Sequence, residues 1–304
     1  METEILYPEP LRKGDQICLI DPANARTQEA INKVADFLEE KGFRVTVAEE
    51  MGFKRGTWKE RARRLNQAIR DEKNRALFCI WGGYGTMTLL EELDYDAFRR
   101  NCPALVGFSD ITALHGALGQ RSGVVTFHGP ASFGQKRLMS QETFESMLAL
   151  IMDPKKEREI CNLDGTAFQM LTKDSQARCR EGRLTGGNLT LVSRLMGTPF
   201  EIDTRGKILF LEEVGEKPYR LHGMLMQLRL AGKLSQAAGI LVGSLRGCDN
   251  EGCPGSAMEA VKDVLGDLPV PVLTNIQAGH LEETLTLPMN ATIRIEGNQI
   301  YQRI

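Results

Sequence analysis

The first half of the chain alternates strand-like and helix-like segments, and this alternation restricts the fold more than any other feature. The strand-like segments are short and apolar or alternating, and they occupy residues 16–20, 44–48, 76–80, 104–106 and 124–127. The helix-like segments between them occupy residues 27–41, 59–71, 87–92 and 111–118. Repeated strand–helix units pack as a parallel sheet covered by helices on both faces. The sequence therefore predicts an α/β domain, and ligands of such sheets bind beyond the carboxyl ends of the strands.

A second folding unit is expected after residue 180. A helix at Glu142–Met152 closes the first domain, and residues 153–180 are rich in charge without a clear period. Further strand-like and helix-like segments occupy residues 184–196, 207–211, 218–231, 239–242, 256–265, 270–273, 285–287 and 291–296. We therefore predict a first domain at 1–152, a linker at 153–180 and a smaller β/α domain at 181–304, with a cleft between the two domains.

Charge and cysteine content exclude several classes of protein. The 304 residues carry a formal net charge of −2, which gives no general attraction to nucleic acids or anionic membranes. The seven cysteines are odd in number and scattered, which is not the pattern of a disulfide framework. Cys248 and Cys253 lack a second ligand pair, so no metal site is expected. With no signal peptide and no membrane span in the sequence, we expect a cytoplasmic protein.

Ser109 is the candidate nucleophile. It lies where a buried apolar segment meets a helical pattern, in residues 103–116, PALVGFSDITALHG. A sharp strand-to-helix turn can expose a serine hydroxyl, and the amides that open the helix can face a developing oxyanion. The alternative is a serine that only caps the helix. The strict G-x-S-x-G pattern is not met, because Ile111 occupies the position of its second glycine.

A serine nucleophile needs a base, and the chain has four histidines. His115 lies on the same predicted helix as Ser109, too far around it to take its proton. His222 falls within a predicted helix and is expected to pack or to face solvent. His280 lies in a loop between two strands, where it could present an imidazole, and His128 follows a strand. The sequence favours His280 and leaves His128 as the second choice.

The orienting carboxylate is expected at the end of another strand. The apolar strand ILFL ends in Glu212 and Glu213. A solvated strand terminus is the alternative. Glu212 continues the buried alternation, so one of the two acids should point inward. A buried acid requires a partner, and an imidazole can supply one.

A glycine turn, Gly82-Gly83-Tyr84-Gly85, follows a predicted strand in the first domain. It lacks the G-K-[ST] ending of a phosphate-binding loop and has an incomplete G-x-G-x-x-G pattern. A plain tight turn and an oxyanion loop both remain open, since glycines let backbone amides approach a carbonyl closely.

Taken together, these motifs resemble the LD-carboxypeptidase family, the S66 serine peptidases. The matching motifs are GGYG after a strand, GFSD-x-TAL, L-x-GGNL with GTP shortly after, LFLEE-x-x-E-x-PYR, and GH followed by TLP. They occur in the family's order and span nearly the whole chain. The resemblance implies a flavodoxin-like, class I amidotransferase-like parallel sheet in the first domain, and a homodimer with an interdomain active site.

The resemblance also implies the chemistry. It assigns a catalytic triad of Ser109, Glu212 and His280, with oxyanion amides from Gly83, Gly85 and Asp110. The implied substrate is the murein tetrapeptide, from which terminal D-alanine is released during peptidoglycan recycling, without a cofactor or metal. A sister branch cleaves acylated nucleotide antibiotics of the microcin C type. A non-catalytic binding protein is a further alternative, and a cysteine hydrolase using Cys79 or Cys102 is disfavoured.

The chain departs from the family near the glycine turn. Trp81 and Thr88 stand where members typically have arginines, and His222 and Gly223 alter a Tyr-Arg-Ile-Asp-Arg stretch. We expect Trp81 and Tyr84 to contact the substrate. Arginine side chains bind peptide carboxylates well. Arg183, Arg220 and Arg246 are the candidate arginines for this contact elsewhere in the chain.

Overall fold

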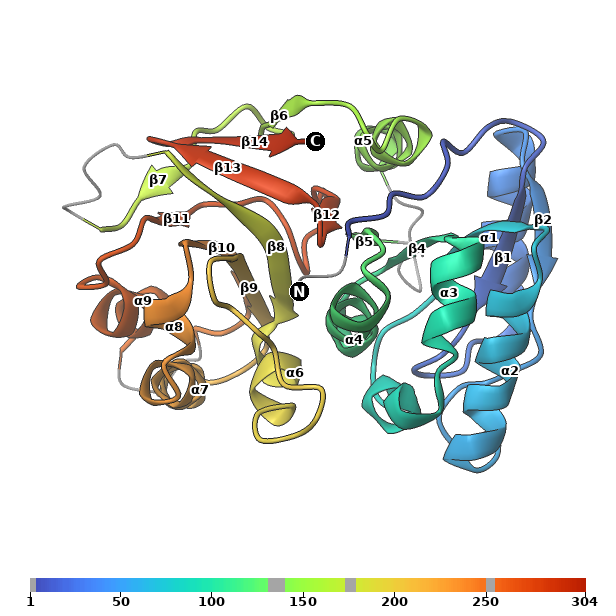
Figure 1. Ribbon diagram of the computed structural model, residues 1–304, viewed down its shortest axis with the longest axis horizontal. Coiled ribbons are helices and arrows are strands. Elements are labelled where there is room, and N and C mark those ends of the chain that lie inside the picture. Colours follow the sequence, from blue (N-terminus) through green and yellow to red (C-terminus); the bar gives the residue numbers. More distant parts are fainter. Residues whose placement is uncertain (1–3, 131–139, 173–178, 250–254) are drawn as a thin grey trace. The chain divides into compact units, whose positions relative to one another are not determined.

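The computed structural model describes residues 4–130, 140–172, 179–249 and 255–304, and the chain divides into two compact units. Unit 1 comprises Met1–Lys155 and Thr286–Asn290. Unit 2 comprises Lys156–Leu285 and Ala291–Ile304. Each unit is built on its own sheet (Figure 1).

The sheet of unit 1 has the strand order β12-β5-β4-β3-β1-β2. Its strands are β1 (Gln16–Ile20), β2 (Arg44–Val47), β3 (Asn74–Cys79), β4 (Ala104–Gly107), β5 (Thr126–His128) and β12 (Leu287–Met289). All neighbours are parallel except β12, which pairs antiparallel with β5. From β2 to β5 this is the flavodoxin-type order, 2-1-3-4-5. The chain adds β2 on one side of β1 and then β3, β4 and β5 on the other side, so the switch point lies between β1 and β3. The predicted fold class is therefore confirmed.

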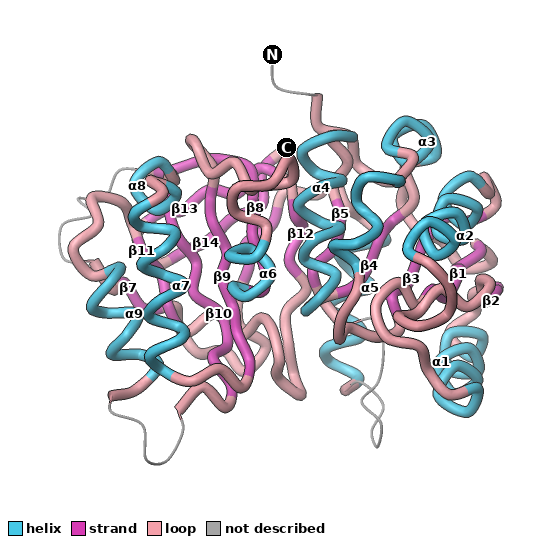
Figure 2. The backbone as a smooth tube through the Cα atoms, turned by 90° about the horizontal axis from the view of Figure 1, so that it is seen from below, coloured by secondary structure: helices cyan, strands magenta, loops and turns pink. Residues whose placement is uncertain are grey.

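Helices cover both faces of this sheet (Figure 2). They are α1 (Gln28–Glu40), α2 (Trp58–Arg70), α3 (Tyr95–Asn101), α4 (Thr112–Ser122) and α5 (Gln141–Met152), with 3₁₀ turns η1 (Thr86–Glu92) and η2 (Ser109–Ile111). Phe37 of α1 meets Phe144 of α5 edge to face, with ring centroids 4.8 Å apart. Helices α2, α3 and α4 pack side by side on the other face. A capping box of Thr57 and Glu60 starts α2.

Unit 2 contains a mixed sheet of order β6-β14-β13-β8-β9-β10-β11-β7. Its strands are β6 (Arg158–Ile160), β7 (Gln169–Met170), β8 (Arg180–Asn188), β9 (Ile208–Val214), β10 (Gly239–Arg246), β11 (Val272–Thr274), β13 (Thr292–Glu296) and β14 (Gln299–Arg303). Strands β8 to β11 are parallel neighbours. A leucine- and valine-rich core joins them to α6 (Leu189–Arg194), α7 (Pro218–Leu230), α8 (Lys233–Gln236) and α9 (Ala257–Leu265).

The structure differs from the sequence-based expectation in two segments. Within residues 153–180, expected as a linker, β6 and β7 pair antiparallel with strands of unit 2. The strand expected at 285–287 lies at Leu287–Met289 and belongs to the sheet of unit 1. Strands of two or three residues carry no readable period, and only the tertiary structure shows which partner supplies their hydrogen bonds.

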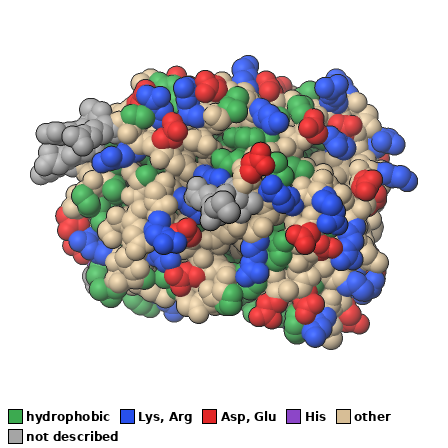
Figure 3. All heavy atoms as spheres, viewed as in Figure 1, with side chains coloured by type: hydrophobic (Ala, Val, Ile, Leu, Met, Phe, Trp, Pro, Cys, Tyr) green, Lys and Arg blue, Asp and Glu red, His purple; other side chains and the backbone are tan. Residues whose placement is uncertain are grey.

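The surface carries both signs of charge. Figure 3 shows lysine and arginine side chains interspersed with aspartate and glutamate on the face viewed. Such mixing fits the small net charge of −2. The longest helices in the described ranges have 13 residues, whereas a bilayer span needs about 20. None of the described helices can therefore cross a membrane.

His115 fixes the end of the strand that precedes Ser109. Its Nδ1 lies 2.7 Å from Thr126 Oγ1 on β5, and its Nε2 lies 2.8 Å from the carbonyl oxygen of Gly107 on β4. A carbonyl can only accept, so Nε2 carries the proton and Nδ1 accepts from the threonine hydroxyl. Burial lowers the pKa of His115 to about 4, against the opposing hydrogen bond to Gly107. His115 is therefore a structural residue of unit 1, buried neutral.

We predict that His115 makes folding pH-dependent. The unfolded chain binds the proton near pH 6.5 and the folded chain only near pH 4, so stability falls as pH drops through this window. Across this window the free energy of unfolding should fall by about 3 kcal/mol, because each unit of difference between the folded and unfolded pKa corresponds to about 1.4 kcal/mol. Urea unfolding of wild type and His115→Gln between pH 4 and 7.5 measures it. The wild type should lose more stability than the variant, with exposed His222→Gln as control. Parallel pH curves would contradict this assignment.

Candidate active site

Ser109 lies on a strained turn at the carboxyl end of β4. Phe108 is extended, whereas Ser109 has a φ of +63°, a conformation that costs a non-glycine residue about 1–3 kcal/mol. Gly107 permits the sharp turn, since a Cβ there would lie 2.9 Å from both Cys79 Cβ and Ile111 Cγ2. The N-cap of α4 is Ile111, and no side chain caps that helix. The serine therefore does not serve as the helix cap considered as the alternative.

The glycine turn packs directly against this serine. A Cβ at Gly82 would lie 2.8 Å from Ser109 Cβ and 3.0 Å from its Oγ. Gly83 and Gly85 have φ values of +112° and +128°, which only glycine adopts readily. Gly83 is exposed and Gly85 is buried. The turn therefore lies beside the serine and presents backbone next to its hydroxyl.

Asp110 connects the serine turn to the glycine turn. Its buried carboxylate accepts from the Thr86 amide at 2.8 Å, and the Thr86 hydroxyl donates to the Asp110 carbonyl oxygen at 2.5 Å. Burial raises the pKa of Asp110, while hydrogen bonds from Thr86 and the Gly85 amide act against that rise. The Gly85 amide is thus directed at this carboxylate. Both glycine amides expected to line an oxyanion hole belong to this turn, and the one of Gly85 also faces the Asp110 carboxylate.

Arg61, which the sequence pattern did not single out, supports the same turn. Its side chain is 2 % exposed, and it donates to the carbonyl oxygens of Met51 at 2.6 Å and Pro22 at 2.8 Å. It also donates to Thr88 Oγ1 at 3.2 Å, and that hydroxyl donates to the Gly85 carbonyl at 2.6 Å. One guanidinium thereby joins the loops that follow β1, β2 and β3.

The helical spacing of the sequence contained a pattern that could have identified Arg61 as buried. Arg61, Leu65 and Ile69 are spaced i, i+4, i+8, so the arginine lies in the apolar stripe of α2. Burial lowers its pKa, and the nearby charges of Asp110 and Asp21 oppose that effect. A charged residue in an apolar stripe indicates a partner inside the fold.

Glu212 and His280 form a hydrogen-bonded pair in unit 2. Glu212 lies on β9, is fully buried, and its Oε2 is 2.7 Å from Nδ1 of His280. Since the carboxylate accepts, Nδ1 carries the proton and Nε2 has the lone pair, an assignment made from the hydrogen-bond network. The imidazole of His280 is 18 % exposed. A buried carboxylate that orients an imidazole in this way makes it competent as a general base.

The loop before His280 is shaped around this carboxylate. Gly279 has a φ of +115°, and a Cβ there would lie 2.7 Å from Glu212 Oε2. The Gly279 amide donates to Thr284 Oγ1 at 3.0 Å, and that hydroxyl donates back to the Gly279 carbonyl at 3.1 Å. Only glycine allows this close approach, which explains the GH motif.

Glu213 has a different role from its neighbour. Both acids are buried, although the sequence led us to expect only one to point inward. Glu213 accepts from the amides of Thr190 at 2.8 Å and Val214 at 2.9 Å, and from the Asn188 side chain at 3.0 Å. Asn188 also caps α6. Glu213 and the asparagine of the GGNL motif therefore fix the start of α6.

The remaining histidines lie elsewhere. His128, the second choice as base, is fully buried on β5, with its ring 6.2 Å from that of Phe108 and 5.9 Å from that of His115. It is therefore part of the core of unit 1. His222 is a surface residue whose Nε2 lies 2.9 Å from Asp263.

Residues expected to contact substrate have mixed placements. Tyr84 is 42 % exposed and meets Phe53 edge to face at 4.9 Å. The Trp81 ring lies beneath the guanidinium of Arg26. Arg220 is ion-paired with Glu216 at 3.6 Å. The other two candidate arginines lie in unit 2: Arg183 on β8, and Arg246, exposed, at the end of β10.

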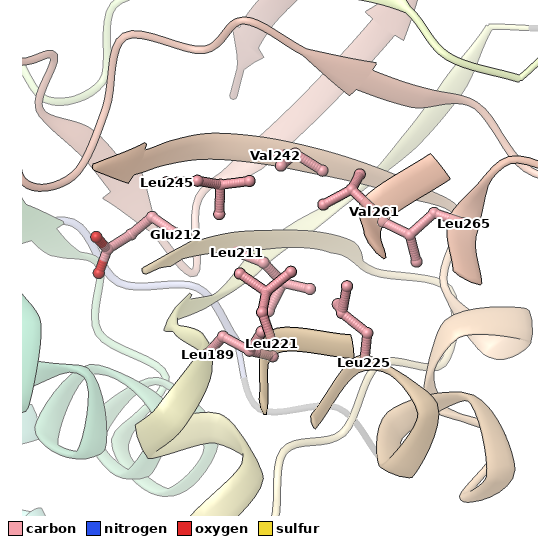
Figure 4. A pocket seen from close by; sticks show the side chains of 9 residues that line it. All are labelled: Leu189, Leu211, Glu212, Leu221, Leu225, Val242, Leu245, Val261 and Leu265. Carbon is pink, nitrogen blue, oxygen red and sulfur yellow. The ribbon is translucent and has the colours of Figure 1, made fainter. Parts of the chain in front are cut away.

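Beside Glu212 lies a small apolar cavity in the core of unit 2. It has a volume of about 10 Å³ and is lined mainly by leucine and valine, among them Leu189, Leu221 and Val261. Figure 4 shows that the Glu212 carboxylate points away from these side chains. The cavity has room for one water at most and is a packing defect. Among the described residues, no cluster of three potential metal ligands occurs.

The candidate catalytic residues are therefore distributed over the two units. Unit 1 holds Ser109, Asp110 and the glycine turn, and unit 2 holds the pair of Glu212 and His280. A serine on a strained turn can act as a nucleophile, and an oriented imidazole can act as its base.

Comparison with known proteins gives the family. Residues 17–129 match the LD-carboxypeptidase N-terminal domain, and residues 181–295 match the LD-carboxypeptidase C-terminal domain. A probable murein peptide carboxypeptidase of Bacillus subtilis is 33% identical over 300 residues, covering 93% of this chain and 89% of the relative. The murein tetrapeptide carboxypeptidase of Pseudomonas aeruginosa is 29% identical, covering 94% of each.

Solved structures agree with this assignment. The microcin C7 self-immunity protein MccF in complex with aspartyl sulfamoyl adenosine superposes with a TM-score of 0.85 at 25% identity, covering 98% of each chain. The muramoyltetrapeptide carboxypeptidase of Oxalobacter formigenes superposes with a TM-score of 0.79 at 26% identity, covering 94% of this chain and 97% of that one. The chain belongs to the LD-carboxypeptidase family, the S66 peptidases.

Proposed function

We propose that this protein is a serine carboxypeptidase that hydrolyses an L,D bond and releases terminal D-alanine from murein tetrapeptide. The observation that carries the proposal is the 2.7 Å hydrogen bond between the buried carboxylate of Glu212 and Nδ1 of His280. The strained turn at Ser109 supports it, because that backbone suits an exposed nucleophile. Relatives described as murein peptide and murein tetrapeptide carboxypeptidases support the choice of substrate.

In the proposed mechanism, Ser109 attacks the scissile carbonyl while Nε2 of His280 takes its proton. Glu212 holds the imidazole in the required tautomer and stabilises the imidazolium that forms. His280 then protonates the leaving D-alanine, and an acyl-enzyme on Ser109 remains. His280 next removes a proton from water, which hydrolyses the acyl-enzyme. The mechanism requires that the Ser109 hydroxyl comes within hydrogen-bond distance of His280 Nε2.

Backbone amides of unit 1 would stabilise the tetrahedral intermediate. We assign this role to the amide of Asp110 together with that of Gly83 or Gly85 in the glycine turn. The mechanism uses no metal or cofactor, because the triad supplies both nucleophile and base.

Cellular location and oligomeric state are also part of the proposal. We propose a cytoplasmic enzyme, and the free thiols of the described cysteines suit a reducing compartment. A homodimer is expected from the family resemblance and stays a prediction.

Replacing the nucleophile should abolish turnover without unfolding the protein. We expect Ser109→Ala to lower the rate of D-alanine release by about 10³-fold or more. Mass spectrometry of the products of a murein tetrapeptide measures it, with circular dichroism to check the fold. A serine-directed fluorophosphonate should label wild type and not the variant. Near-normal turnover by Ser109→Ala would contradict the mechanism, and a folded wild type that is not labelled would favour a binding protein.

The two adjacent buried acids provide a matched pair of variants. Glu212→Gln keeps the size of the side chain but favours the wrong imidazole tautomer, so kcat should fall by about 10³–10⁴-fold. Glu213→Gln should keep kcat within a few fold and lower stability by about 1–3 kcal/mol, since it weakens a hydrogen-bonded anchor of α6. Steady-state kinetics and urea unfolding of both variants test this. Equal loss of kcat in the two variants would argue against the triad.

A second candidate is an amidase of the microcin C type. It is favoured by the structural likeness to MccF in complex with aspartyl sulfamoyl adenosine and by 26% identity to MccF of Escherichia coli. We expect kcat/KM for L-Ala-γ-D-Glu-diamino acid-D-Ala to exceed that for an aminoacyl sulfamoyl adenylate by at least about tenfold, a difference of about 1.4 kcal/mol in transition-state binding. Competition between the two compounds, followed by mass spectrometry, measures the ratio. The opposite ratio would assign the protein to the amidase branch.

A further inference from the structure

Arg26 is a partly buried cation that the described part of unit 1 does not neutralise. It follows β1, and its guanidinium carbon lies 3.0 Å from the centroid of the Trp81 ring. Burial lowers its pKa to about 10, and no neighbouring carboxylate opposes that effect. It stays charged at neutral pH. Placing a charge in a partly dry site without a counter-ion is unfavourable, so an anion bound there would be stabilised.

Its hydrogen-bonding capacity is largely unused. A guanidinium has five N–H donors. Of these, one on Nη2 points to the Ile80 carbonyl oxygen at the long distance of 3.5 Å. Its Nε is buried without an acceptor among the described residues. The Trp81 ring covers one face of the group and leaves the donors of its two terminal nitrogens, which can bind a carboxylate through two parallel hydrogen bonds.

The position of Arg26 relates it to the proposed nucleophile. The chain adds strands to one side of β1 and then, from β3 on, to its other side, and ligands of such sheets bind beyond the strand ends at that switch point. The loops after these two strands are joined there, since the Asn24 amide donates to the Gly82 carbonyl at 3.3 Å. Gly82 in turn packs against Ser109. Arg26 and Ser109 therefore both lie beside the same glycine turn.

We propose that Arg26, held flat by Trp81, binds a carboxylate of the peptide substrate, namely the free C-terminal carboxylate of the released residue. The inference rests on the proposed function. In a carboxypeptidase substrate this carboxylate lies one residue beyond the scissile bond, so its receptor must be close to the nucleophile and the oxyanion amides. Arg26 was not among the arginines that the sequence suggested. Arg220 was among those arginines, and it already has Glu216 as an ion-pair partner.

The test compares Arg26→Gln, Arg26→Lys and wild type on two substrates, the tetrapeptide and the same peptide with a C-terminal amide. For the tetrapeptide, Arg26→Gln should raise KM by roughly ten- to a hundredfold, the usual effect of losing a charge-assisted pair, with kcat changed by less than about threefold. Arg26→Lys should recover part of that loss, because it keeps the charge but not the two-pronged geometry. On the amide, wild type and Arg26→Gln should be equally poor.

The control is Arg63→Gln, which removes the same charge from an exposed position of α2 and should leave both constants unchanged. A tetrapeptide KM within twofold of wild type in Arg26→Gln would overturn the inference while the proposed function stands. An equal loss on the acid and the amide would show that Arg26 does not bind the terminal carboxylate, and would also overturn it. Failure of the wild type to cleave either peptide would overturn the proposed function, and this inference with it. Melting temperatures verify that the variants are folded, and Arg26→Lys tests the inference if Arg26→Gln is not.

Discussion

The hydrogen bond between Glu212 and His280 is the interaction on which the chemistry proposed for this protein depends. A carboxylate without solvent exposure requires a partner, and here the partner is an imidazole 2.7 Å away. The surrounding structure is built to keep that pair in place. Glu212 lies within a parallel strand between two neighbours, and Gly279 brings the backbone of the loop against the carboxylate. The imidazole is thus fixed in orientation before any substrate binds, which is the condition for efficient proton transfer.

In unit 1 the corresponding constraint is backbone strain at Ser109. A positive φ at a serine persists only where the neighbouring structure requires it. Here Asp110 and Thr86 join the strained turn to the glycine turn, and Arg61 joins that turn to the loops after β1 and β2. His115 fixes the strand end two residues earlier. These contacts are buried polar interactions, which are unfavourable when only partly satisfied, so together they favour one arrangement of the turn.

The departures from the family pattern have physical counterparts in the structure. Thr88 stands where members typically have an arginine, and its hydroxyl connects Arg61 with the Gly85 carbonyl. Trp81 stands at the other such position and provides a flat surface for Arg26. At each of these two positions a guanidinium therefore still lies near the glycine turn. Arg61 and Arg26 supply it from other places in the chain. Under the proposed function, specificity for the peptide is accordingly where this protein should differ most from its relatives.

The sequence by itself determined the parallel strands of unit 1, the helices that cover them except α3, and the candidate residues, because long periodic segments and strand-end motifs depend on local pattern. It left open which of Glu212 and Glu213 faces an imidazole, and whether Ser109 caps a helix. It missed Arg61, Arg26 and the strands at 158–160, 169–170 and 299–303. These features were decided by the tertiary structure alone. A buried cation, a carboxylate's partner and a short strand's neighbour are contacts between residues far apart in the chain, and no local period encodes them.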